Sequence, residues 1–214
     1  MRVDDTAESA TPKRVTKRRI QTRERLLDAA LLVFAEEGFG RSTVEQICER
    51  AGYTRGAFYS NFASLDELFL AMWEQRSAQM LIDVREADVA TRAKQQGPVT
   101  LEEMTAALLE AIPVDDRWYR ITAEFTAHAL RNPSLKRVMA ARENSILATI
   151  LPLVEAGLAG VGRRATDTQA LGRALVAVHD GTTVQCLMEP EGDTVRRART
   201  NLFVSVLRNY SEEV

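Results

Sequence analysis

Apolar residues recur along most of this chain at intervals of three and four, which is the spacing of one face of a helix. The first such run passes through Ile20, Leu27, Leu31 and Phe34 and ends at Gly38. No stretch alternates between apolar and polar residues for long enough to predict a strand. The pattern therefore predicts an all-α fold.

Residues 42–62 are predicted to form two short helices around a tight turn. Ser42 and Glu45 have the spacing of a capping box at the start of the first helix, and Thr54 is a good N-cap for the second. Gly52 gives the backbone freedom that a sharp turn between helices needs. Phe58 and Phe62, one turn apart, predict the buried face of the second helix. This is the geometry of a helix-turn-helix, which places one helix in the major groove of DNA.

Further helices follow, separated by glycine and proline. Ser64 and Glu67 form a second capping box, which opens a long helix that extends toward Gly97 and Pro98. The later helices are predicted at 100–112, 116–131, 134–156, 167–188 and 193–210, with a bend at Pro152 and a loop over 157–166.

The composition is that of an ordinary globular protein of 214 residues, with 45% hydrophobic and 27% charged residues. No apolar run is long enough to cross a membrane, and no secretory signal is recognisable, so we expect a cytoplasmic protein. Cys48 and Cys186 lie in apolar helical stretches, and we expect both to pack as small hydrophobic residues rather than to act as redox sensors.

Positive charge is concentrated near the N-terminus. Residues 13–62 contain ten Lys or Arg and six Asp or Glu, a net charge of +4, whereas the whole chain has −2 and the remainder therefore −6. Since this basic segment precedes and includes the helix-turn-helix, we expect it to face the phosphates of DNA.

The N-terminal quarter resembles the DNA-binding domain of the TetR family of bacterial transcription regulators. The matching residues are Phe34 to Phe39, Thr43 to Ile47, Ala51-Gly52, Gly56 to Tyr59 and Phe62. Residues 1–15 are polar and lack periodicity, which predicts a disordered basic arm. The resemblance implies a helix-turn-helix domain over 16–63 and a ligand-binding and dimerisation domain over 64–214.

The helix that Thr54 opens has the side chains that a groove reader needs. Gly56 and Ala57 allow close approach, Ser60 can bond to base edges, and Arg55 can bond to guanine O6 and N7. Tyr59 and Asn61 flank this face and are predicted to bond phosphates, as is Thr43 at the start of the preceding helix. The complete set of predicted DNA contacts is Arg14, Lys17, Arg18, Arg19, Thr43, Thr54, Arg55, Gly56, Ala57, Tyr59, Ser60 and Asn61.

Two positions depart from the family pattern. The family commonly has His or Tyr at the position of Asn61, and a phosphate-contacting Lys at the position of Leu65. Because leucine cannot make that contact, either affinity for DNA is lower or the basic arm compensates.

The resemblance is weaker beyond residue 100 and rests on Trp118 to Pro133 and on Val178 to Gly181. It implies a ligand pocket among the middle helices and a homodimer through the last two helices. The candidate pocket residues combine aromatic, thioether and polar groups: Met72, Trp73, Trp118, Phe125, His128, Met139 and Arg142. The alternative is that most of them belong to the core, as helical apolar stripes usually do.

We therefore expect a transcriptional repressor that binds a palindromic operator as a homodimer and is released by a small molecule. A transcriptional activator of the same family and an architectural DNA-binding protein without a ligand are the alternatives. An enzyme is not expected, because no catalytic motif is present and the chain has only two histidines. No cofactor or metal is predicted.

Overall fold

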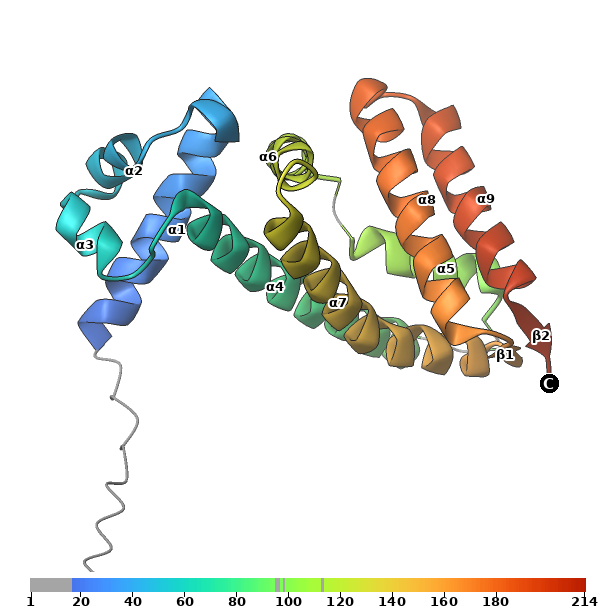
Figure 1. Ribbon diagram of the computed structural model, residues 1–214. Coiled ribbons are helices and arrows are strands. Elements are labelled where there is room, and N and C mark those ends of the chain that lie inside the picture. Colours follow the sequence, from blue (N-terminus) through green and yellow to red (C-terminus); the bar gives the residue numbers. More distant parts are fainter. Residues whose placement is uncertain (1–16, 95–96, 98, 113) are drawn as a thin grey trace, which may run out of the picture.

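The computed structural model describes residues 17–94, 97, 99–112 and 114–214 (Figure 1). The expected arm over 1–15, with Arg14, lies outside the described residues. The predicted fold class is confirmed: an N-terminal helix-turn-helix is followed by a larger helical part. In chain order the elements are α1 (Lys17–Glu37), η1 (Phe39–Arg41), α2 (Val44–Ala51), α3 (Arg55–Tyr59), α4 (Leu65–Lys94), α5 (Leu101–Glu110), α6 (Asp116–Ala129), α7 (Pro133–Gly160), β1 (Arg163–Ala165), α8 (Thr168–Met188), α9 (Asp193–Asn209) and β2 (Ser211–Glu213).

The first three helices gather at one end of the molecule, and the long helix α4 leads from them to the remaining helices (Figure 1). Gly52 ends α2 in the left-handed conformation, with φ +70°, as the turn requires. The predicted cap of α2 was wrong by one residue. Thr43, not Ser42, is the N-cap and forms a capping box with Gln46. The Ser42 hydroxyl instead donates to the Gly38 carbonyl at 2.7 Å, which closes the 3₁₀ turn of η1.

A first apolar core joins the helix-turn-helix to α4, α6 and α7. Phe39, on η1, lies at its centre, with ring centroids 5.9 Å from Phe69 of α4 and 4.9 Å from Phe125 of α6. Phe69 and Phe125 stack with centroids 3.6 Å apart. Both rings are fully buried. The N-terminal helices thus share their core with α6 instead of forming a separate unit.

A second apolar core lies among α5, α7, α8 and α9. The predicted loop over 157–166 was wrong, because α7 continues through Pro152 and Gly157 to Gly160. A Cβ added at Gly157 would lie 2.9 Å from the sulfur of Met104 on α5. Glycine here serves the close approach of α5 to α7 and does not end the helix.

Two short strands follow from the same segment, so the expectation of no strand was also wrong. β1 pairs antiparallel with β2, with Arg163 opposite Glu213 and Ala165 opposite Ser211. The Arg163 guanidinium donates to the Ser211 hydroxyl and carbonyl, at 2.8 Å each. Three-residue strands are too short to leave an alternating pattern in the sequence.

The expected burial of the two cysteines is confirmed. Cys48 and Cys186 are both free and buried, and burial raises the pKa of the Cys48 thiol. Within the described part of the chain, no helix combines the length and the apolar character that a membrane span requires.

Beyond the second core, α8 and α9 contact each other through polar residues, and this contact around Arg199, Thr182, Thr183 and His179 is called the seam below. Arg199 of α9 is only 5% exposed and donates to the hydroxyls of Thr182 and Thr183 on α8, at 3.1 and 3.0 Å. Its Nη2 lies 3.1 Å from Nδ1 of His179. Burial, and secondarily the Arg199 charge, lowers the pKa of His179 to about 4. The imidazole is therefore neutral at neutral pH.

This depressed pKa predicts that acid destabilises the fold through His179. The unfolded chain binds a proton near pH 6.5 and the folded chain only near pH 4, so the contribution of His179 is complete above about pH 6.5 and is lost toward pH 4. The shift corresponds to roughly 3 kcal/mol of unfolding free energy across that window. Urea denaturation of wild type and His179→Gln at several pH values measures it. The variant should lose less stability on acidification, and parallel losses would contradict the prediction.

Candidate nucleic-acid interface

Helix α3 is short, and its orientation is fixed by two buried phenylalanines. The Thr54 hydroxyl accepts from the Ala57 N–H at 3.2 Å and caps the helix as predicted. Phe58 and Phe62 are buried with ring centroids 5.8 Å apart. The predicted outward face is open to solvent: Thr54, Arg55, Gly56, Tyr59 and Ser60 are exposed, whereas Ala57 and Asn61 are half-buried.

Packing inside the protein does not require the glycine at position 56. A Cβ added there would meet only Thr54 Oγ1, at an ordinary 3.7 Å. Glycine within a helix costs about 0.5–1 kcal/mol relative to alanine. An exposed helical glycine without an internal reason is suited to the close approach of an external partner.

Arg55 and Thr43, two of the predicted contacts, have partners on α2. Arg55 Nη1 lies 3.0 Å from Glu45 Oε1 of α2, and both side chains are largely exposed. A surface pair of this kind contributes little free energy, so Arg55 can leave Glu45 for a base edge. The Thr43 N–H donates to Gln46 Oε1 at 2.8 Å, and a phosphate at this site would have to replace the glutamine.

Asn61 is held by its own helix. Its amide donates to the Ala57 carbonyl at 2.8 Å and to the Ser60 hydroxyl at 3.2 Å, and that hydroxyl donates to the same carbonyl at 2.8 Å. Asn61 Oδ1 is buried without a hydrogen-bond donor among the described residues. These bonds turn the Asn61 amide toward α3 and place Ser60 as the more accessible of the two. Leu65, the other departure from the family pattern, packs against the first core.

Arginines of α1 contact the C-terminal end of α3. Arg19 donates to the Ser60 carbonyl at 3.2 Å, and Arg23 donates to the Asn61 carbonyl at 3.4 Å. The Arg23 guanidinium also lies over the Phe62 ring, 4.4 Å from its centroid. Cations are favourable beside the carbonyls that end a helix. The sequence analysis assigned Arg19 to phosphate and did not identify Arg23, whose role depends on a contact 38 residues away.

The charges of α1 oppose its own helix dipole. Its first turn has no acidic residue and its last turn no basic one. Lys17, Arg18 and Arg19 are exposed at the N-terminal end, and Glu36 and Glu37 at the C-terminal end. Charges of this sign at the two ends of a helix are unfavourable. The arrangement instead puts positive charge beside α3.

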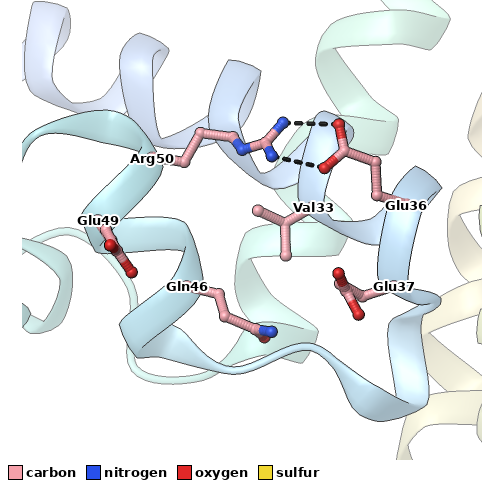
Figure 2. Close-up of a pocket in the computed structure, with 6 residues that line it drawn as sticks. All are labelled: Val33, Glu36, Glu37, Gln46, Glu49 and Arg50. Atoms are coloured by element: carbon pink, nitrogen blue, oxygen red, sulfur yellow. Dashed lines mark hydrogen bonds and ion pairs between the residues drawn. The ribbon is translucent and has the colours of Figure 1, made fainter.

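A polar hollow of about 300 Å³ lies at the acidic end, between α1 and α2 (Figure 2). The carboxylates of Glu36, Glu37 and Glu49 line it together with Arg50. Arg50 donates to both oxygens of Glu36, at 2.7 and 2.5 Å, and this hydrogen bonding lowers the pKa of Glu36. With three carboxylates against one guanidinium, the hollow is less favourable for a phosphate than the basic start of α1.

The predicted ligand residues lie on α4, α6 and α7 beside the first core. Met72 and Phe125 are buried within it, and Trp73, Trp118 and Met139 pack partly buried against it. His128 Nε2 is 3.2 Å from Asp66 Oδ1, a close contact that lacks hydrogen-bond geometry. Arg142 donates to the Leu70 carbonyl at 3.0 Å. The structure brings these residues together as packed side chains, and their role in binding a ligand stays a prediction.

Across the described ranges, no group of three or more His, Cys, Asp or Glu side chains is arranged to hold a metal ion.

Comparison with known proteins gives matches over both parts of the chain. Residues 26–72 match the family described as bacterial regulatory proteins, tetR family, and residues 100–209 match the C-terminal part of BetI-type transcriptional repressors. The transcriptional regulator AcrR of Shigella flexneri is 32% identical over 118 residues, which are 54% of this chain and only about half (53%) of that protein.

Two further relatives are similar over most of the chain. The transcriptional repressor AcnR of Corynebacterium efficiens is 28% identical over 76% of this chain and 80% of its own length. The crystal structure of the multidrug binding protein EbrR complexed with imidazole superposes with a TM-score of 0.58 at 26% identity, and covers 93% of this chain and 95% of that one.

Gly56→Ala should separate stability from DNA binding. The added methyl group fits beside Thr54 and raises helix propensity, so the unfolding free energy should rise by about 0.5–1 kcal/mol. The same methyl group should hinder approach to base edges and weaken binding to specific DNA. Thermal unfolding and a fluorescence binding titration on one preparation measure both effects. A variant that binds DNA as tightly as wild type would remove Gly56 from the interface.

Arg23→Gln should reveal whether Arg23 positions α3 or contacts phosphate. If it positions the helix, affinity for the operator should fall while the dependence of log K on log salt keeps its slope. The exposed Arg18 is the matched control, because loss of one phosphate contact should flatten that slope by about 0.9. Equal flattening in Arg18→Gln and Arg23→Gln would make Arg23 a phosphate contact.

Proposed function

The chain belongs to the TetR family of bacterial regulatory proteins, and on this basis we propose that it is a transcriptional repressor that binds operator DNA as a homodimer and is released by a small molecule. The family consists of transcriptional regulators and not of enzymes. The proposal goes beyond family membership in three respects: the sign of regulation, the dimer and the response to a ligand.

DNA binding is supported above all by the exposed face of α3. Gly56 and Ala57 leave room for the backbone to approach base edges, and Arg55 has only a weak surface partner to give up. We assign base contacts to Arg55, Gly56, Ala57 and Ser60, and phosphate contacts to Tyr59 and the basic start of α1. Such a division between base reading and backbone positioning is general among DNA-binding proteins.

A homodimer through α8 and α9 is supported by the outer face of that helix pair. The two helices pack on each other (Figure 1), and Leu202 is 45% exposed on the outside of α9. Both helices also expose small residues, which allow a second helix pair to pack closely: Ala177 and Gly181 on α8, and Ala198 and Ser205 on α9. A twofold dimer would present two copies of α3 to the two halves of a palindrome.

Release by a ligand is supported by the regulators that this chain resembles. EbrR is described as a multidrug binding protein and its structure contains imidazole, and AcnR is described as a repressor. In this chain the first core places α6 directly against Phe39, so a change in α6 would shift the helix-turn-helix. A ligand shifts the equilibrium between two arrangements of the helix-turn-helix only if it binds one arrangement more tightly than the other.

The test is a footprint over the DNA that flanks the gene, combined with sedimentation of the protein–DNA complex. We expect two protected half-sites centred about one helical turn, or a small multiple, apart, with two or more chains per site. Protection that overlaps the promoter and reduced transcription in vitro indicate repression, whereas stimulated transcription would show an activator. A single asymmetric half-site bound by a monomer would refute the dimer.

A further inference from the structure

We propose that the polar seam around Arg199 binds the carboxylate group of the small-molecule effector. This inference rests on the proposed function, because it names the chemical class of the ligand. It concerns α8 and α9, and none of the residues assigned to ligand binding from the sequence belongs to this seam.

The first argument is an uncompensated charge. Arg199 is only 5% exposed, yet its hydrogen-bonding partners are the neutral groups of Thr182, Thr183 and His179. Over the residues that the structure describes, no carboxylate forms an ion pair with it. A buried charge without a counter-ion is costly, and the cost falls when an anion arrives.

The second argument is an excess of hydrogen-bond donors. Arg199 uses both Nη1 hydrogens and one Nη2 hydrogen on its three partners. Its Nε–H, the second Nη2–H and the Thr183 hydroxyl hydrogen have no acceptor among the described side chains and backbone groups. The acceptor atoms of the three partners already face Arg199, so the groups of this cluster that remain unpaired are donors. Such a set is complementary to an acceptor with two oxygens.

His179 contributes no charge to the seam. Its Nδ1 accepts from Arg199, so the neutral ring carries its proton on Nε2. Burial keeps the pKa of this imidazole low, at about 4. The seam therefore has a net charge of +1 at neutral pH, which a carboxylate balances, whereas a phosphate dianion would exceed it.

The surroundings indicate that the acid carries an apolar group. The Arg199 guanidinium lies 5.4 Å from the centroid of the Phe203 ring, and Phe203 belongs to the second apolar core with Leu171 and Leu175. Cys186 is buried on the same helix as the threonines. An aromatic or aliphatic monocarboxylate suits a charged seam that continues into hydrocarbon.

Calorimetric titration of the full-length protein with benzoate and octanoate tests the proposal, with benzamide and octanamide as neutral analogues of the same shape. At least one carboxylate should bind about tenfold or more tightly than its amide, because a charge-assisted hydrogen bond is lost in the amide. Arg199→Gln should reduce carboxylate affinity to that of the amide. Arg197→Gln, which removes an exposed arginine two residues earlier on α9, should have no effect.

If circular dichroism shows that Arg199→Gln does not fold, Thr183→Val keeps the charge and removes one donor. It should weaken carboxylate binding by about two- to tenfold. Carboxylates that bind no better than their amides, or binding that is unchanged in the folded Arg199 and Thr183 variants, would overturn the inference.

Two further readouts separate the alternatives. If sedimentation shows that Arg199→Gln dissociates the dimer while carboxylate binding persists, the counter-ion is a carboxylate of the second copy, and the inference is wrong. The footprint experiment is scored independently. Specific DNA binding without carboxylate binding would leave the proposed function intact and reject only the ligand class, whereas Arg199-dependent carboxylate binding without specific DNA binding would reject the regulator and keep the site.

Discussion

The contact on which the rest of this structure depends is the edge-to-face packing of Phe39 against the stacked rings of α4 and α6. Phe69 and Phe125 are buried against each other at 3.6 Å, and Phe39 brings the end of α1 to both. Closely packed aromatic cores do not deform gradually, since even a small gap forfeits dispersion energy. The helix-turn-helix therefore moves with α6 or repacks as a whole, and its orientation is set from outside itself.

Near that core, several residues of α1 and α3 lower the stability of the fold. The basic start of α1 opposes its own dipole, and Gly56 occupies a helical site where alanine would fit. Arg19 and Arg23 recover part of this cost by bonding the carbonyls at the end of α3. Residues that lower the stability of the fold and lie together on one surface indicate a functional site more strongly than any single residue does.

The sequence was informative wherever local chemistry decided the outcome. The periodicity, Gly52 and the cap at Thr54 predicted the helix-turn-helix, because each acts within a few residues. Contacts between distant segments were not predictable. Gly157 was read as the end of a helix, but its meaning depends on Met104 of α5, and the short strands depend on Arg163 meeting Ser211. Arg23 and Arg199 were missed for the same reason, since their partners lie 38 and 16 to 20 residues away.

The two ends of the molecule are joined by α6, which packs against η1 and also contacts α8. A carboxylate bound beside Arg199 would add a charged hydrogen bond to the seam of α8 and α9 without touching the aromatic core. It could influence DNA binding only if the seam binds the anion more tightly in one arrangement of α6 than in the other. Because Phe125 of α6 is fixed to Phe39 by packing, any such difference reaches α1 without an intervening flexible segment. In this proposal Arg199 recognises the ligand, and the aromatic core transmits the resulting change to the DNA-binding helices.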